Sequence, residues 1–113
     1  MQYGGDYNSV LLNRYVHAQD SVSWHSDDEP EMDSRYAIAS LSLGASRIFL
    51  VRPITNKEIA DKKAVQSYLL TAGSLLVMPA GFQQAYQHCI PKSQTPCGSR
   101  VNLTFRRMKL EEG

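Results

Sequence analysis

The chain has 113 residues, 42% of them hydrophobic, with two cysteines and a formal net charge of +1. These figures allow one domain with an apolar core, and they exclude a disulfide scaffold and a strongly basic nucleic-acid-binding tail. Because no apolar run approaches the roughly 18 residues of a membrane span and no secretory signal is evident, we expect an intracellular protein without a membrane partner, cytoplasmic or, in a eukaryote, nuclear, and monomeric by default.

Apolar and polar residues alternate with a period of two in most of the chain, and Gly, Pro, Asn or Asp interrupts them at short intervals. This pattern predicts an all-β domain, and so many short strands in a small domain favour a barrel or jelly roll. The stretch 56–66 is crowded with Lys, Glu and Asp, which predicts a solvated loop or a single helical turn. The predicted strands cover residues 7–16, 21–25, 36–43, 47–52, 67–70, 74–78, 83–90 and 99–107.

The first predicted strand carries two polar side chains on one face. Because successive residues of a strand point to opposite sides, Asn13 and Tyr15 share a face with Leu11. An amide and a phenol among apolar residues could form a hydrogen-bonded pair in the core. They could equally complete a small polar pocket, and this strand alone leaves both interpretations open.

The motif His-Ser-Asp at 25–27 is the sharpest short signal in the chain. Residues two apart in an extended segment face the same way, so His25 and Asp27 can bind one metal ion together. His88, near the end of a later predicted strand, is the natural third ligand. Two histidines and one carboxylate form the triad typical of Fe(II) enzymes that activate oxygen. Each part occurs often by chance, so the prediction depends on their combination.

Four other side chains are expected to have ordinary roles. Arg47 and Arg52 lie in the segment Arg-Ile-Phe-Leu-Val-Arg and are expected at the surface, with contact to a substrate or its phosphates as the alternative. Cys89 and Cys97 lie near His88, but they lack the Cys-x-x-Cys spacing of a zinc site. We therefore expect both cysteines to be free thiols.

The last predicted strand alternates most clearly. Its apolar residues, at positions 101, 103 and 105, are expected to be ordinary core. If the polar face is the wet side of a sandwich, it needs no explanation; if the strand lines a barrel, its guanidinium groups form a carboxylate clamp, because arginine binds planar anions through two hydrogen bonds. The polar face carries Arg100, Asn102, Thr104 and Arg106.

In combination these motifs resemble the catalytic core of the AlkB family of Fe(II)- and 2-oxoglutarate-dependent nucleic-acid demethylases. The likeness spans almost the whole chain and is closest to the DNA-repair branch of the family. It implies a double-stranded β-helix, with 1–113 forming a single dioxygenase core domain that lacks the N-terminal substrate lid and is truncated or minimal. The matching segments are 13–15, 25–29, 42–49, 73–78, 88 and 100–106.

The resemblance also implies a role for each site residue. The far carboxylate of 2-oxoglutarate would pair with Arg106, and Arg100 would support its near end. The ligands of Fe(II) would be His25, Asp27 and His88. Further hydrogen bonds to the co-substrate would come from Asn13, Tyr15 and Asn102.

Two acidic residues follow the metal motif, and on their own they would be read as a solvated turn. The resemblance implies that Glu29 first, and Asp28 second, read the exocyclic group of the target base. A carboxylate near a positively charged methylated base is electrostatically favourable. By the same likeness Met78 would pack beside the co-substrate, while Trp24 is expected to pack against the protein rather than stack on a base.

The activity implied is oxidative demethylation of N-alkylated bases in methylated DNA or RNA, as in alkylation repair. Fe(II), 2-oxoglutarate and O₂ would perform the oxidation, with formaldehyde released, while the protein positions the reactants. A base within a duplex would have to be flipped out of the stack. The alternatives are a hydroxylase of a protein or small molecule with the same fold, and a non-catalytic fragment of such a domain.

Overall fold

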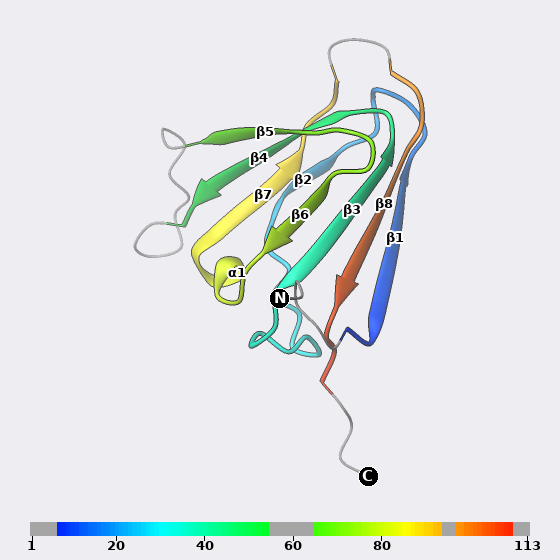
Figure 1. Cartoon of the computed structure of the whole chain (residues 1–113). Coiled ribbons are helices and arrows are strands. Elements are labelled where there is room, and N and C mark those ends of the chain that lie inside the picture. The colour runs from blue at the N-terminus through cyan, green and yellow to red at the C-terminus, as the bar shows by residue number, and fades with distance from the viewer. Residues whose placement is uncertain (1–6, 55–64, 94–96, 110–113) are drawn as a thin grey trace.

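The computed structural model describes residues 7–54, 65–93 and 97–109, and it consists mainly of β-strands. Two four-stranded sheets face each other as in a jelly roll (Figure 1). The predicted all-β, double-stranded β-helix is therefore confirmed. In chain order the elements are β1 (Ser9–Tyr15), β2 (Val22–His25), β3 (Ile38–Gly44), β4 (Arg47–Pro53), β5 (Gln66–Leu70), β6 (Leu75–Met78), α1 (Phe82–Ala85), β7 (Tyr86–Ile90) and β8 (Arg100–Arg106).

The strand order brings distant parts of the chain together. The first sheet has the order β1-β8-β3-β6, and the second has the order β2-β7-β4-β5. Because β1 lies antiparallel to β8, Asn13 is the register partner of Asn102, and Tyr15 is the partner of Arg100. The polar residues of the first and last predicted strands therefore occupy one face of one sheet.

Every predicted strand is present, with small differences in its ends. Gln83 was expected to begin a strand, but it lies on α1, a single turn of helix. The chain turns there because Gly81 adopts a left-handed conformation (φ 90°) and the Phe82 amide donates to the carbonyl of Pro79 (3.0 Å). The predicted charged loop at 56–66 lies outside the described residues, except for positions 65 and 66. No helix among the described residues is long and apolar enough to cross a membrane.

One of the two alternatives for β8 is observed, in which the polar row lines the barrel, whereas the apolar face does not form the expected core. Its polar row is buried and points between the sheets, while its apolar residues are only half-buried on the outer face. On that outer face Leu12, Leu103, Leu41 and Leu75 are paired in register across all four strands of the first sheet. Leu12 is 61% exposed, so the expected apolar core on this face was wrong. Alternation fixes which side chains share a face, but it does not fix which face turns inward.

The apolar core is supplied by both sheets: four of its eight buried residues lie on the second sheet, three on the first and one outside the strands. The second-sheet residues that line the cavity are apolar except for the two histidines, whereas the polar row of β8 lies on the first sheet. The polar row can therefore bind a polar ligand while the apolar side chains keep the hydrophobic contacts that stabilise the fold. The buried apolar residues are Tyr15, Met32, Ile38, Phe49, Val51, Leu70, Met78 and Ile90.

The turn between β3 and β4 fixes the start of β8. Gly44 has a φ of 87°, and a side chain there would collide with the backbone carbonyl of Ser99. The next residue, Ala45, donates its amide to that same carbonyl (2.9 Å). Gly44 is also the register partner of Arg100. Only glycine fits here without strain, and the close approach holds Arg100 at the end of the polar row.

Candidate active site

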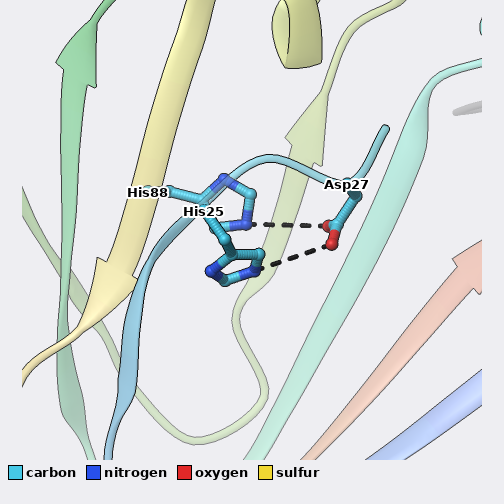
Figure 2. A group of neighbouring side chains, drawn as sticks. All are labelled: His25, Asp27 and His88. Atoms are coloured by element: carbon cyan, nitrogen blue, oxygen red, sulfur yellow. Dashed lines mark ion pairs between the residues drawn. The ribbon is translucent and has the colours of Figure 1, made fainter. Parts of the chain in front are cut away.

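The three predicted metal ligands lie together (Figure 2). His25 ends β2 and is paired directly with His88 on β7. Asp27 lies in the following loop, and its two carboxylate oxygens are each 3.6 Å from the Nε2 atom of one histidine. All the candidate ligand atoms lie within 4.8 Å of one another. This set of two imidazoles and one carboxylate suits Fe(II) and would leave coordination positions open for other ligands.

The surroundings of the triad support its role as a metal site. The Nδ1 atom of His25 lies 2.7 Å from the carbonyl oxygen of Ser23, which can only accept a hydrogen bond. The proton therefore lies on Nδ1, and the lone pair of Nε2 is free for a metal. Burial acts to raise the pKa of Asp27, but the hydrogen bond from His88 and the charges of both histidines lower it below its ordinary value. Asp27 is thus anionic at neutral pH, as a metal ligand would need to be.

Two hydrogen bonds from outside the motif hold its loop in place. The amide of Asp27 donates to Oε1 of Gln83 (2.8 Å), and the hydroxyl of Ser26 donates to the carbonyl of Tyr86 (2.6 Å). Gln83 is buried, and its Nε2 donates to the sulfur of Met78 (3.5 Å). The sequence prediction missed Gln83, because no short motif marks a contact between residues 56 positions apart.

A cavity of about 210 Å³ extends from the metal ligands into the space between the sheets. Its polar wall comes from β1 and β8, and its apolar wall includes Phe49 and Met78. The cavity therefore unites the predicted metal site with all the predicted co-substrate side chains. The five side chains predicted to bind the co-substrate all line it: Asn13, Tyr15, Arg100, Asn102 and Arg106.

Arg100 lies at one end of the polar row. It is 2% exposed, its Nη2 donates to the hydroxyl of Ser42 (2.8 Å), and its guanidinium carbon is 5.0 Å from the centre of the Tyr15 ring. Its Nε is buried and has no hydrogen-bond partner among the described residues. Burial raises the pKa of Tyr15, although the charge of Arg100 acts in the opposite direction. The phenol is therefore protonated at neutral pH and can donate a hydrogen bond.

Arg106 lies at the other end of the row, beside the metal ligands. Its Nη1 is 3.5 Å from a carboxylate oxygen of Glu29, and its charge helps to lower the pKa of Asp27. Because β8 spans seven residues at about 3.4 Å each, its two ends lie roughly 20 Å apart. The structure thus favours the reverse of the expected division, with Arg106 near the metal and Arg100 at the far end.

The two acidic residues after the motif border a second cavity of about 190 Å³. Asp28 and Glu29 are exposed on its rim, and Asp27 and Gln83 contribute to its wall. The predicted base-reading residues are therefore adjacent to the metal carboxylate. The neighbouring Asp33 is not simply solvated, because it is buried and binds Arg35 through both carboxylate oxygens.

Arg47 and Arg52 differ from one another in the structure. Arg52 is half-buried, with its guanidinium 4.0 Å from the centre of the Trp24 ring, so Trp24 packs against the protein as predicted. The surface position predicted for Arg47 was wrong, since it is only 3% exposed. Arg47 is buried because its Nη2 donates to the backbone carbonyls of Asp20 and Pro91, which strand pairing brings next to the start of β4.

The remaining reactive side chains lie outside the candidate site. His17 is exposed in the turn after β1, where its ring lies 3.8 Å from Asp20. Cys89 and Cys97 are free thiols, as predicted. Burial raises the pKa of Cys89, so this thiol is neutral at physiological pH. These side chains therefore do not contribute to the metal site.

The fold and this donor set define a class of enzyme. The family model described as the 2OG-Fe(II) oxygenase superfamily matches residues 3–106 of the chain. The chain therefore belongs to the superfamily of oxygenases that use 2-oxoglutarate and Fe(II). The three ligands at the mouth of an arginine-lined cavity fit both of these groups.

Similarity to individual proteins points within this superfamily to the AlkB homologues. The chain is 42% identical over 109 residues to alpha-ketoglutarate-dependent dioxygenase alkB homolog 3 of Rattus norvegicus, covering 91% of this chain and 36% of that protein. It is 38% identical over 120 residues to DNA oxidative demethylase ALKBH2 of Arabidopsis thaliana, covering 91% of this chain and 38% of that protein. The predicted resemblance to the AlkB family is confirmed, and the chain spans little more than a third of the length of these relatives.

A solved structure, described as the structure of OsALKBH1, shares the fold. It superposes with a TM-score of 0.66 over 90% of this chain and 48% of that chain, at 20% sequence identity. The jelly-roll architecture is thus the same although few residues are identical.

Proposed function

We propose that the chain is the oxidising core of a dioxygenase that removes alkyl groups from the ring nitrogens of bases in DNA or RNA. The observation that carries the proposal is the single cavity in which His25, Asp27 and His88 meet the buried arginines of β8. One set of relatives is named DNA oxidative demethylase, and this supports the choice of substrate.

The chain's part in the chemistry is to bind and orient. Bound Fe(II) and 2-oxoglutarate supply the oxidising chemistry, which couples decarboxylation of the co-substrate by O₂ to hydroxylation of a methyl group. The hydroxymethyl group is lost from nitrogen as formaldehyde. His25, Asp27 and His88 would hold the metal, and the cavity lined by these residues and the polar row would hold the co-substrate beside it.

The polar row would orient the co-substrate along β8. Arg106 would attract its carboxylate beside the metal, and Arg100 with the Tyr15 phenol would bind its far carboxylate. Asn102 is held ready between them, because Thr104 donates to its Oδ1 (2.7 Å) and its Nδ2 donates to the hydroxyl of Ser40. A side chain fixed in this way orients a ligand at little cost in conformational entropy.

The second cavity would receive the base. Asp28 and Glu29 place two carboxylates on its rim, where they would attract a base whose ring nitrogen carries a positive charge after methylation. Asp27 borders both cavities, so the methyl group would reach the metal from the side of the second cavity. A base from a duplex would enter only after leaving the stack.

An anaerobic titration separates the oxygenase proposal from a non-catalytic module. The protein loaded with Fe(II) should give a weak visible charge-transfer band on addition of 2-oxoglutarate, and His25→Ala should abolish it. His17→Ala is the matched control, because this histidine lies outside the site. A folded protein that gives no band would refute the oxygenase proposal.

The substrate is tested next by succinate release with O₂ present. Methylated oligonucleotides should stimulate release well above the level seen with unmethylated ones of the same sequence. Equal release with both would favour an oxygenase of a protein or small molecule.

A further inference from the structure

The ring of Tyr15 lies close to two buried guanidinium groups. The carbon of the Arg100 guanidinium is 5.0 Å from the centre of the ring, and that of Arg47 is 5.5 Å away. The two arginines are 2% and 3% exposed. Neither forms an ion pair with a carboxylate among the described residues. Two positive charges are therefore buried around one aromatic ring.

Part of the arrangement of Arg47 is accounted for by the fold. Its Nη2 donates to the carbonyl of Asp20 (2.7 Å) and to that of Pro91 (2.6 Å). These hydrogen bonds connect β4 to the residues just before β2 and just after β7. Its Nη1 is buried and has no hydrogen-bond partner among the described residues. The carboxylate of Asp20 is the acidic group whose charge Arg47 influences, but that carboxylate accepts the amides of Val16 and His17 at the surface.

A buried charge that lacks a close counter-charge destabilises a protein, and hydrophobic residues of similar size usually stabilise it more. Two backbone carbonyls would be satisfied equally well by a neutral donor. Among the described residues, the Tyr15 ring is a contact that depends on the charge of Arg47, but no carboxylate forms an ion pair with this charge. An anion that binds close to both arginines would compensate it.

The cavity beside Tyr15 is where such an anion would bind. Tyr15 and Arg100 line the cavity, whereas Arg47 does not line it and contacts the ring of Tyr15. A cation against the ring makes the phenol a stronger hydrogen-bond donor and raises the positive potential at this end. In agreement with this geometry, the charges of both arginines oppose the rise that burial causes in the pKa of Tyr15.

We propose that Arg47 is a positioning residue that acts through Tyr15 and makes this end of the cavity select a 2-oxo acid with a second, far carboxylate over one without it. This inference rests on the proposed function, in which the cavity binds 2-oxoglutarate. It adds a residue on β4 to a site otherwise built from β1 and β8.

The test compares two ligands that share the metal-binding end. 2-Oxoglutarate carries the far carboxylate and 2-oxobutanoate does not, so the ratio of their affinities measures recognition of that group. Both are titrated anaerobically into the Fe(II)-loaded protein and followed by the charge-transfer band. Arg47→Gln keeps a donor for the carbonyls and removes the charge, so 2-oxoglutarate should bind about tenfold more weakly while the affinity for 2-oxobutanoate changes less than about twofold.

Two further variants separate charge from structure. Arg47→Lys keeps the charge and should keep the affinity ratio within about threefold of the original, even if its melting temperature falls. Arg14→Gln removes an exposed charge next to Tyr15 in sequence, and it should leave both affinities unchanged. The lysine variant is decisive if Arg47→Gln does not fold.

The outcomes are distinct. If Arg47→Gln lowers the affinity for both ligands equally, or lowers neither in the folded variant, Arg47 only stabilises the fold. Loss of the ratio in a folded Arg47→Lys variant would also contradict the proposal. If the original protein binds neither ligand, the proposed function fails and this inference fails with it.

Discussion

His25 and His88 are register partners across β2 and β7, and the centres of their imidazole rings lie 4.3 Å apart. The pairing of two strands thus fixes the spacing of two candidate metal ligands that are far apart in the sequence. His88 is further held by stacking on Phe49, with ring centres 5.2 Å apart. The site is therefore built on the rigid part of the sheet, with only Asp27 supplied by a loop.

The first prediction concerns the carboxylate of the triad. Asp27→Asn removes the negative charge between the two histidines, so affinity for Fe(II) should fall by more than the roughly 10–100-fold that loss of a supporting residue costs. The measurement is a metal titration of the folded protein in the absence of oxygen. His17→Ala should bind metal as the original does, and equal losses in both variants would contradict the assignment.

Gln83 should contribute to metal binding through the backbone of Asp27. Gln83→Leu leaves that amide without its acceptor and loosens the loop, so we expect a loss of about tenfold in Fe(II) affinity. The neighbouring Gln84 is exposed on α1, which makes Gln84→Leu a matched control. Unchanged affinity in a folded Gln83→Leu variant would show that the loop keeps its shape without this contact.

The two arginines of β8 should differ in which end of the co-substrate they bind. Arg100→Gln should lower the affinity for 2-oxoglutarate by about tenfold or more. The affinity for 2-oxobutanoate should hardly change, because this ligand has no far carboxylate. Arg106 lies beside Asp27, so Arg106→Gln should weaken the binding of both ligands. The opposite pattern, measured by the same anaerobic titration, would restore the division expected from the sequence.

Replacement of Gly44 should lower the stability of the fold. Gly44→Ala combines a left-handed backbone with a collision against the carbonyl of Ser99, so it should destabilise the fold by about 2–3 kcal/mol in urea unfolding. Gly73 has a similar φ of 79° but open space around it. Gly73→Ala should therefore cost only about 1 kcal/mol. Equal costs at the two positions would mean that the close approach contributes nothing.

Stability should fall at low pH because of Asp33. Its hydrogen bond from the Arg35 side chain lowers the pKa of this carboxyl from 3.8 to about 2. A carboxyl with a lowered pKa stabilises the folded state fully above its unfolded value, and this contribution is lost as the pH falls from about 4 through about 2. Urea midpoints measured across this range should fall less steeply for Asp33→Asn. If the urea midpoints of Asp33→Asn and of the original protein fell in parallel with pH, the stabilising role of the Asp33–Arg35 pair would be contradicted.

Much of the fold could be predicted because its signals are local. Alternation and turn residues identified every strand, and the spacing of His25 and Asp27 indicated a metal site before its third ligand was located in space. The alternation of β8 left two alternatives open, because an amphipathic strand does not reveal which side is enclosed. Here the polar side is enclosed, since it lines a cavity whose opposite wall is apolar.

The contributions of Arg47 and Gln83 could not be predicted for a different reason. Each depends on contacts between elements that are distant in the chain, such as Arg47 with the carbonyl of Pro91, 44 residues away. A single arginine in a strand is usually exposed, because burial of its charge is unfavourable. Only the three-dimensional pairing of strands shows that this arginine lies close to the ring of Tyr15.

The central claim is that this chain oxidises the methyl group of an N-methylated base. Its most direct test is mass spectrometry of methylated DNA and RNA oligonucleotides after incubation with the protein, Fe(II), ascorbate and 2-oxoglutarate. We expect at least one oligonucleotide to lose its methyl group with release of formaldehyde, and His25→Ala to leave it intact. A folded protein that binds Fe(II) and 2-oxoglutarate yet leaves the whole panel methylated would contradict the claim.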